Sequence, residues 1–264
     1  RLDEAAALHE RSLAVAEEID GPLDRASAHT NLGVVAGMQD RLDDSRTHLE
    51  ASLAFARASG VRPAVSEQLG NLAEVCLLQG DREGARRYAD AAIALRQALG
   101  VPVREAYAWY QRARLSLVES DLLACQEHVD RARRLAGEVG LHPGVIRLFR
   151  AQLALQRGEP EEALAEATWV AEAASWSPRF HRLAQAVRGE ARLVLGDEGG
   201  RADLEEAVAA LRAQGIPDAI RIGLCCAARG LRDRRLLDEA VALGRPPDGT
   251  VAALDLARTR SLLD

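Results

Sequence analysis

The stretch NLGVVAGMQDR at residues 31–41 has a counterpart, NLAEVCLLQGD, at residues 71–81. Each copy carries a residue suited to a tight turn near its end, Asp40 in the first and Gly80 in the second. The same turn position returns along the chain at Ser120, Gly158, Gly196 and near Arg235. A period of about 38 to 40 residues predicts structural units stacked in series.

Each unit has the pattern of two helices. A small residue stands five positions after every turn position except Gly196, and Ala5 fits the same pattern one period before the first turn. A small side chain there allows two helices to approach closely. These residues are Ala5, Ser45, Ala85, Cys125, Ala163 and Ala240. Apolar residues then follow at helical spacing, as at Leu49 and Leu53. Breaks such as Gly21-Pro22 close each pair, because Gly ends helices and Pro begins them.

This unit resembles the tetratricopeptide repeat. The family's Leu-Gly pair, followed about twelve residues later by a small residue, matches Leu32-Gly33 with Ser45 and Leu72-Ala73 with Ala85. The period exceeds that of the common repeat, so the resemblance is to the long-repeat class. That class includes kinesin light chain, Rap-type regulators and the sensor arms of bacterial STAND-type ATPases.

The resemblance implies an all-α fold, a right-handed α-solenoid of antiparallel helix pairs. We expect about 13 helices in about six or seven repeats, forming a single domain over residues 1–264 with one continuous core. The parts expected are 1–21, the second helix of a truncated first repeat; repeats 22–60, 61–100, 101–140, 141–176, 177–215 and 216–244; and a capping helix at 250–263. In the fifth full repeat the turn is lengthened, so its second helix is expected to begin near Ala202.

The composition excludes several classes of function. The 264 residues include 40 acidic and 34 basic ones, a net charge of −6, and all the basic ones are arginine. Without lysine there is no phosphate-binding lysine and no Schiff base, and the acidity argues against nucleic-acid binding. The spacing of the histidines and cysteines favours neither a metal site nor a catalytic set. We therefore expect no enzyme activity, no cofactor and no membrane or nucleic-acid partner, in a cytoplasmic protein.

Asn31 and Asn71 occupy equivalent positions inside two predicted helices. Asn is a mediocre helix former, so its recurrence there suggests a use. The resemblance places the first helix of each pair on a concave face, where an Asn amide can bind a peptide backbone; bonding to a neighbouring helix is the alternative. The candidate peptide- or partner-binding residues are Thr30, Asn31, Glu67, Asn71, Glu74, Tyr107, Tyr110, Gln111, Arg114 and Gln152.

Two further features bear on these positions. Tyr107 and Tyr110 lie one helical turn apart in a chain that is only 3% aromatic, and Tyr is favoured at recognition surfaces. Arginines accumulate in the first helices of the third to fifth full repeats, where they could bind an anion or pair with acids on adjoining helices. The candidate anion-binding residues are Arg114, Arg147, Arg150, Arg188 and Arg192.

The expected function is that of a non-enzymatic interaction module, which binds a peptide or partner protein in its concave groove. The resemblance and the absence of an initiator Met suggest the sensor or regulatory arm of a larger, multidomain bacterial signalling protein, whose other domains are further candidate partners. The alternative is a receptor arm for a small molecule or anion, using the arginine-rich face.

Overall fold

The computed structural model describes residues 2–100, 102–138, 144–173, 177–244, 246–248 and 250–264. Within them the chain forms fourteen α-helices, against about 13 expected. The helices group into two compact units, residues 1–140 and 141–264. The assignment of the whole chain to one domain stays a prediction, and the repeat boundaries expected at 140/141 and 176 lie outside the described residues.

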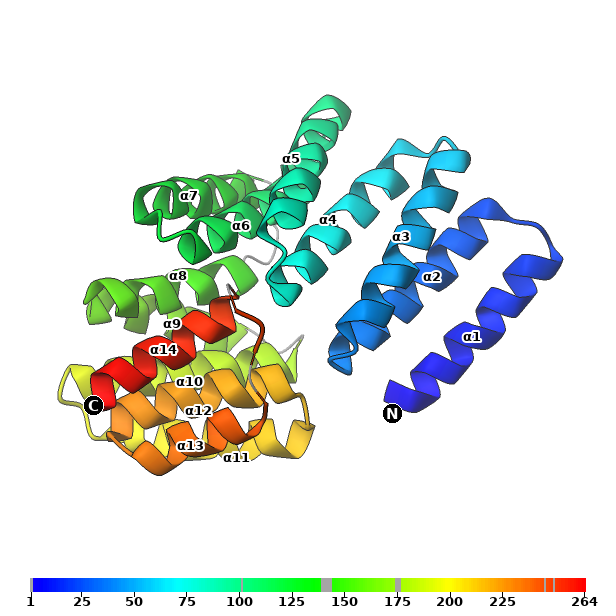
Figure 1. The fold of residues 1–264 in the computed structure, drawn as a ribbon. Coiled ribbons are helices and arrows are strands. Elements are labelled where there is room, and N and C mark those ends of the chain that lie inside the picture. Colours follow the sequence, from blue (N-terminus) through cyan, green and yellow to red (C-terminus); the bar gives the residue numbers. More distant parts are fainter. Residues whose placement is uncertain (1, 101, 139–143, 174–176, 245, 249) are drawn as a thin grey trace. The chain divides into compact units, whose positions relative to one another are not determined.

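Residues 1–140 form seven helices that pack as successive antiparallel pairs (Figure 1). They are α1 (Leu2–Glu18), α2 (Pro22–Met38), α3 (Leu42–Ala58), α4 (Arg62–Gln79), α5 (Arg82–Leu99), α6 (Pro102–Val118) and α7 (Leu122–Glu138). The first helix of each pair, here called an A helix, packs on its own partner B helix and on the B helix before it. The A helices α4 and α6 also contact each other.

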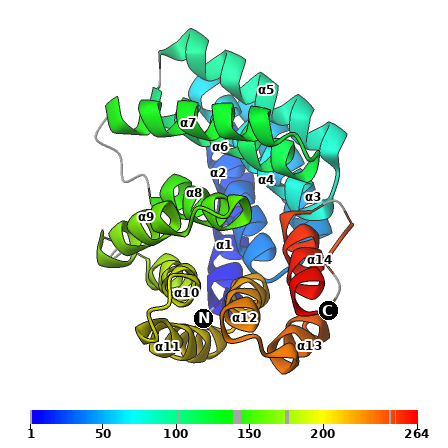
Figure 2. The same cartoon turned by 90° about the vertical axis from the view of Figure 1, so that its left-hand side faces the viewer.

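Residues 141–264 form the other seven helices, in which α8–α9, α10–α11 and α12–α13 are the pairs (Figure 2). Their bounds are α8 (Gly144–Arg157), α9 (Pro160–Ala173), α10 (Pro178–Val194), α11 (Gly199–Gln214), α12 (Pro217–Leu231), α13 (Arg234–Ala242) and α14 (Val251–Leu263). The A helices of this unit are α8, α10 and α12, and α10 contacts both of the others.

The turns between paired helices fall where the repeat places them. Asp40, Gly80 and Ser120 have φ angles of 63°, 78° and 62°, in the left-handed region that ends many helices. In each case the next N–H bonds the carbonyl oxygen five residues earlier, as Asp81 N does to Cys76 O at 2.9 Å. Gly158 and Gly196 take the same left-handed conformation, so five of the six predicted turn positions are confirmed.

Two boundaries in the second unit differ from the prediction. The last turn was expected near Arg235, but the left-handed residue is Arg232, and Asp233 then caps α13. Helix α11 begins at Gly199 rather than near Ala202. The early start is possible because Gly200 lies against α10, where a side chain would not fit: its Cβ would be 2.4 Å from Gly189 O.

The small residues of the repeat lie where two helices come closest. Ser45, Ala85, Cys125 and Ala163 are each 0% exposed. In the first pair, Ser45 Oγ donates to Gly33 O at 2.7 Å, and a Cβ on Gly33 would lie 2.8 Å from Leu49 Cγ. The predicted close approach of A and B helices is therefore confirmed at this contact.

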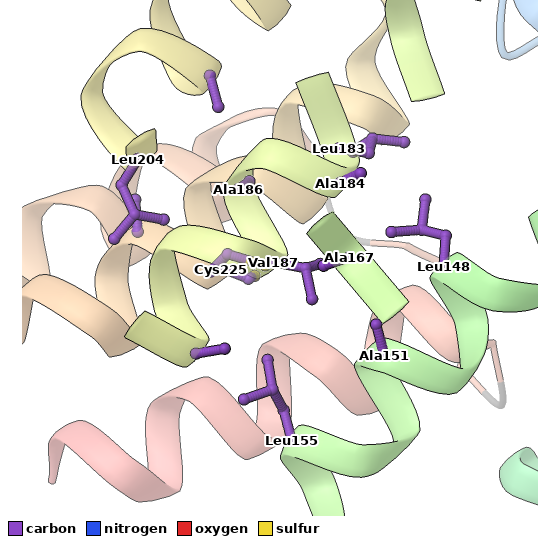
Figure 3. Packing of buried hydrophobic residues seen from close by; sticks show 14 of the residues in the cluster. Leu148, Ala151, Leu155, Ala167, Leu183, Ala184, Ala186, Val187, Leu204 and Cys225 are labelled. Carbon is purple, nitrogen blue, oxygen red and sulfur yellow. The ribbon is translucent and has the colours of Figure 1, made fainter. Parts of the chain in front are cut away.

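Each unit has its own apolar core, made mainly of Ala, Leu and Val. In residues 141–264 the core runs through helices α8 to α13, and Leu148, Ala167, Val187 and Leu204 are four of its buried residues (Figure 3). In residues 1–140 a cluster around Leu49, Leu53 and Leu72 joins α3, α4, α5 and α6. The candidate site residues are side chains of the A helices that these cores hold in place.

Candidate functional site on the A helices

A partly buried ion pair joins two successive A helices in the first unit. Arg114 on α6 donates to Glu74 on α4, with Nη1 2.5 Å from Oε1, and the side chains are 12% and 27% exposed. The Arg114 guanidinium also lies over the ring of Tyr110, 5.6 Å from its centroid. Burial opposes the charge on Arg114, but the Glu74 carboxylate outweighs it, so the pKa of Arg114 is raised. These three side chains therefore form a fixed, charge-compensated base for the A-helix surface.

A second, exposed ion pair lies between the same two helices. Arg104 Nη1 is 2.9 Å from Glu67 Oε2, and the two side chains are 46% and 44% exposed. Exposed pairs of this kind contribute little to stability, about 0–1 kcal/mol. A ligand with a basic group could therefore replace Arg104 as the partner of the Glu67 carboxylate at little cost in stability.

Tyr107 and Tyr110 form an aromatic pair on α6. Their ring centroids are 5.7 Å apart with the planes tilted by 44°. Tyr107 is 38% exposed, whereas Tyr110 is half-buried beneath Arg114. A rigid aromatic side chain that is open to solvent on one side is a common anchor for a bound partner.

The two equivalent asparagines remain accessible to different degrees. Asn31 is exposed on α2, and Asn71 is half-buried on α4. Asn71 Nδ2 lies 3.5 Å from Gln68 Oε1, the limit of a hydrogen bond. The amides at both positions can therefore turn toward a ligand.

Two predicted binding residues serve the packing of the helices instead. Gln111 is 0% exposed, and its Nε2 donates to Gly70 O on the neighbouring A helix at 2.7 Å. Thr30 is half-buried, and its hydroxyl bonds Ala26 O at 2.8 Å and Ser52 Oγ on α3 at 2.9 Å. The expectation that they face a ligand is corrected: their polar atoms pair with adjoining helices.

Arg96 is a functional neighbour that the sequence pattern did not reveal. It reaches from α5 between two A helices, 3% exposed, and donates to Ser66 O at 2.8 Å and Arg104 O at 2.6 Å. Burial lowers its pKa to about 10. Gly70 makes room for it, because a Cβ there would lie 2.5 Å from Arg96 Nη2. The sequence offered one signal for this contact: Gly70 stands inside a predicted helix, where a glycine can mark the close approach of another side chain.

The five candidate anion-binding arginines all have carboxylate partners. Arg114 pairs with Glu74, Arg147 with Glu166, Arg150 with Glu162 and Glu166, Arg188 with Asp203, and Arg192 with Asp197 and Asp203. Arg188 binds Asp203 in bidentate fashion, with distances of 2.9 and 2.6 Å. Four of them reach toward acids on or next to the B helix of their own repeat. Of the two alternatives, this arrangement favours ion pairing, and anion binding by these arginines stays a prediction.

The second unit also has an ion pair between two A helices, which was not predicted. Arg229 on α12 holds Glu190 on α10 through Nε and Nη2, at 2.6 and 2.8 Å. This contact joins α10 to α12 as the Arg114–Glu74 contact joins α6 to α4. Gln152, the remaining candidate, is half-buried on α8. Glu190 stands six residues before its turn residue, as Glu74 does, whereas Arg229 stands three residues before the turn at Arg232, so repeat spacing does not predict this contact.

The described residues contain no group of three or more His, Cys, Asp or Glu side chains that could hold a metal ion. His128, which lies near Cys125 in sequence, pairs its Nδ1 with Ser116 Oγ at 3.1 Å and stacks on Trp109. In the same described residues, no helix has the length and apolar character needed to cross a membrane.

The first unit carries the repeats that the sequence predicted. The tetratricopeptide repeat family model matches residues 1–58 and 24–98, so this part of the chain is similar to tetratricopeptide repeats. No curated protein matches the chain in sequence.

Solved structures share the fold across most of the chain. BtubC (BKLC) from P. vanneervenii is similar with a TM-score of 0.61 and 12% identity, over 81% of this chain and 92% of that one. The apo form of the quorum sensor NprR from B. thuringiensis is similar with a TM-score of 0.62 and 9% identity, over 99% of this chain and 84% of that one. The expected all-α fold of stacked helix pairs is thereby confirmed.

Proposed function

We propose that this chain is an interaction module that binds a peptide or a segment of a partner protein on the A helices of residues 1–140. The repeats of residues 1–98 support an interaction or sensing role. The observation that carries the proposal is the row of accessible side chains on α2, α4 and α6. It combines the amides of Asn31 and Asn71 with the exposed Glu67 and Tyr107.

These side chains suit an extended or helical peptide. An Asn amide offers one donor and one acceptor, as one peptide unit requires. Tyr107 offers an apolar face beside them, and Glu67 offers a carboxylate to a basic or N–H group of the ligand. The partly buried Glu74–Arg114 pair joins α4 to α6, so little ordering of these two helices is needed when the ligand binds.

We further propose that binding has a regulatory purpose, in which the chain is a sensing arm of a signalling protein. Its fold similarity to the quorum sensor NprR supports this reading. The same proposal includes an attached effector like that of the bacterial STAND-type ATPases, and a cytoplasmic location.

A peptide-display selection against the full chain tests the binding proposal. Affinities of the selected peptides are then measured by fluorescence anisotropy for the wild type and for Asn71→Ala/Tyr107→Ala. Loss of an aromatic anchor and an amide contact should weaken binding about tenfold or more. The matched control is Thr47→Ala/Leu123→Ala, which changes two exposed side chains on the B helices α3 and α7. Equal affinities for the wild type and Asn71→Ala/Tyr107→Ala would contradict the proposal.

A further inference from the structure

Helix α14 (Val251–Leu263) lies along the A helices of its unit rather than at the end of the row. It contacts α12 and α13, and Arg258 Nη2 donates to Leu155 O in the last turn of α8 at 2.8 Å. Leu256 packs on the core that includes α10. Figure 1 shows the red α14 between α8 and α12. A helix that capped only the last pair would have no contact with α8.

The main attachment of α14 is a buried polar network. Arg229 Nη1 on α12 donates to Asp255 Oδ1 and to Thr259 Oγ1, both at 2.7 Å. The Arg229 and Asp255 side chains are 7% and 17% exposed, and Thr259 is fully buried. The two α14 residues stand one helical turn apart, so they face Arg229 together. Hydrogen bonds to a charged group of this kind are among the stronger ones in proteins.

The surface beneath α14 shares one repeat position with the candidate site of the first unit, because Glu190 is equivalent to Glu74. Glu190 and Arg229 join α10 to α12 as Glu74 and Arg114 join α4 to α6. In residues 1–140 this side of the A helices carries the exposed Asn31 and Tyr107. In residues 141–264 the same side carries a helix of the chain itself.

We propose that the A-helix face of α8, α10 and α12 is a second binding surface, specific for a helix, and that α14 is its internal ligand. The partner that fits is an amphipathic helix with a carboxylate, an apolar residue next to it and a hydroxyl four residues after the carboxylate, as in Asp255, Leu256 and Thr259. Such a helix displaces α14 and takes over its contacts with Arg229.

The attachment of α14 is suited to exchange. Arg229 keeps its bidentate bond to Glu190 when α14 leaves, so no charge on the face is left without a partner. The side chains of α14 other than Thr259 are half-buried or exposed, and Leu262 is 61% exposed. The segment 243–250 connects α14 to α13, and a short connection of this kind gives the internal ligand a high effective concentration. A free competitor therefore binds weakly to the wild type.

A trans-binding experiment on the full chain tests this inference. The probe is a fluorescent synthetic peptide with the sequence of residues 250–264. The variant Asp255→Asn/Thr259→Val weakens the internal helix and leaves the surface intact, so it should bind the probe at least about tenfold more tightly than the wild type does. A probe carrying the same two substitutions should not bind. The matched control Arg260→Gln/Ser261→Ala, on the exposed side of α14, should behave as the wild type.

Equal uptake of the probe by variant and wild type, or equal binding of the altered probe, would overturn the inference. Hydrogen exchange of the variant provides the second measurement. Faster exchange confined to α14 supports an exchangeable internal ligand, whereas faster exchange throughout α8 to α13 would show that α14 is a fixed part of the core. The substitutions and the surface tested lie within residues 141–264, so failure of this experiment is distinguishable from failure of peptide binding on residues 1–140.

Discussion

At the scale of single residues, glycine and serine decide how closely the helices of a pair approach. Gly33 and Gly189 stand at equivalent positions, seven residues before Asp40 and Gly196. A Cβ on Gly189 would lie 2.8 Å from the backbone oxygen of Gly200 and 2.9 Å from Leu204 Cγ. Backbone atoms cannot move aside as a flexible side chain can, so this contact requires glycine.

Gly189→Ala should lower the free energy of unfolding by about 1–3 kcal/mol, because the added methyl group separates α10 from α11. Gly137→Ala is the matched control: it lies in the last turn of α7, and a Cβ there meets nothing within 4 Å. That change should raise stability by up to about 1 kcal/mol through helix propensity. Urea denaturation followed by circular dichroism measures both. Equal effects of the two substitutions would show that close packing at Gly189 is unimportant.

At the scale of elements, polar contacts between A helices set their spacing. Apolar packing joins each A helix to its B helices, but the Glu74–Arg114 pair and Gln111 bridge α4 and α6 directly. A buried pair is costly to break by removing one partner, because the other charge stays behind without compensation. The face proposed to bind a peptide therefore depends on contacts that a ligand does not touch.

Glu74→Leu should lower the free energy of unfolding by about 2–4 kcal/mol, since Arg114 loses its carboxylate. The double substitution Glu74→Leu/Arg114→Leu should cost less than Glu74→Leu alone, because it removes both charges. The exposed Glu67–Arg104 pair between the same helices is the control, and Glu67→Ala should cost about 0–1 kcal/mol. Thermal and urea unfolding of the wild type and these three variants measure the changes in the free energy of unfolding. A double variant less stable than Glu74→Leu would argue against a buried charge as the cause.

At the scale of the whole molecule, the repeat pattern predicted the fold and most helix boundaries. Period, turn residues and small residues are local properties, so they can be read from the chain directly. The conformations of long side chains cannot be predicted in this way, because they depend on which carboxylate lies within reach after folding. This is why Gln111 was expected to face a ligand but pairs with a neighbouring helix, and why the docking of α14 on Arg229 was missed. For the same reason the sequence left open whether Arg188 binds an anion or pairs with an acid such as Asp203.

Stability as a function of pH is also a property of the whole chain, because every titrating group contributes to it. Burial, and secondarily His48 for His29 and Arg112 for His128, lowers the pKa of both histidines below 6.5. The unfolded chain then binds protons more readily than the folded one, so stability is complete above about pH 7.5 and falls as the pH drops through 6.5. Carboxyl groups with lowered pKa values, such as Asp81 and Asp203, add a separate loss below about pH 4.

His29→Gln/His128→Gln should therefore reduce the loss of stability between about pH 7.5 and 5, here called the upper step. It should leave the further loss below about pH 4, the acidic step, unchanged. His9→Gln, a change of the same residue type on α1, is the control and should keep both steps. The measurement is the urea midpoint at pH values from 3.5 to 8. A full upper step in the double variant would assign the proton uptake to other groups. Loss of that step alone would show that two half-buried imidazoles in residues 1–140 account for the response of the chain near neutral pH.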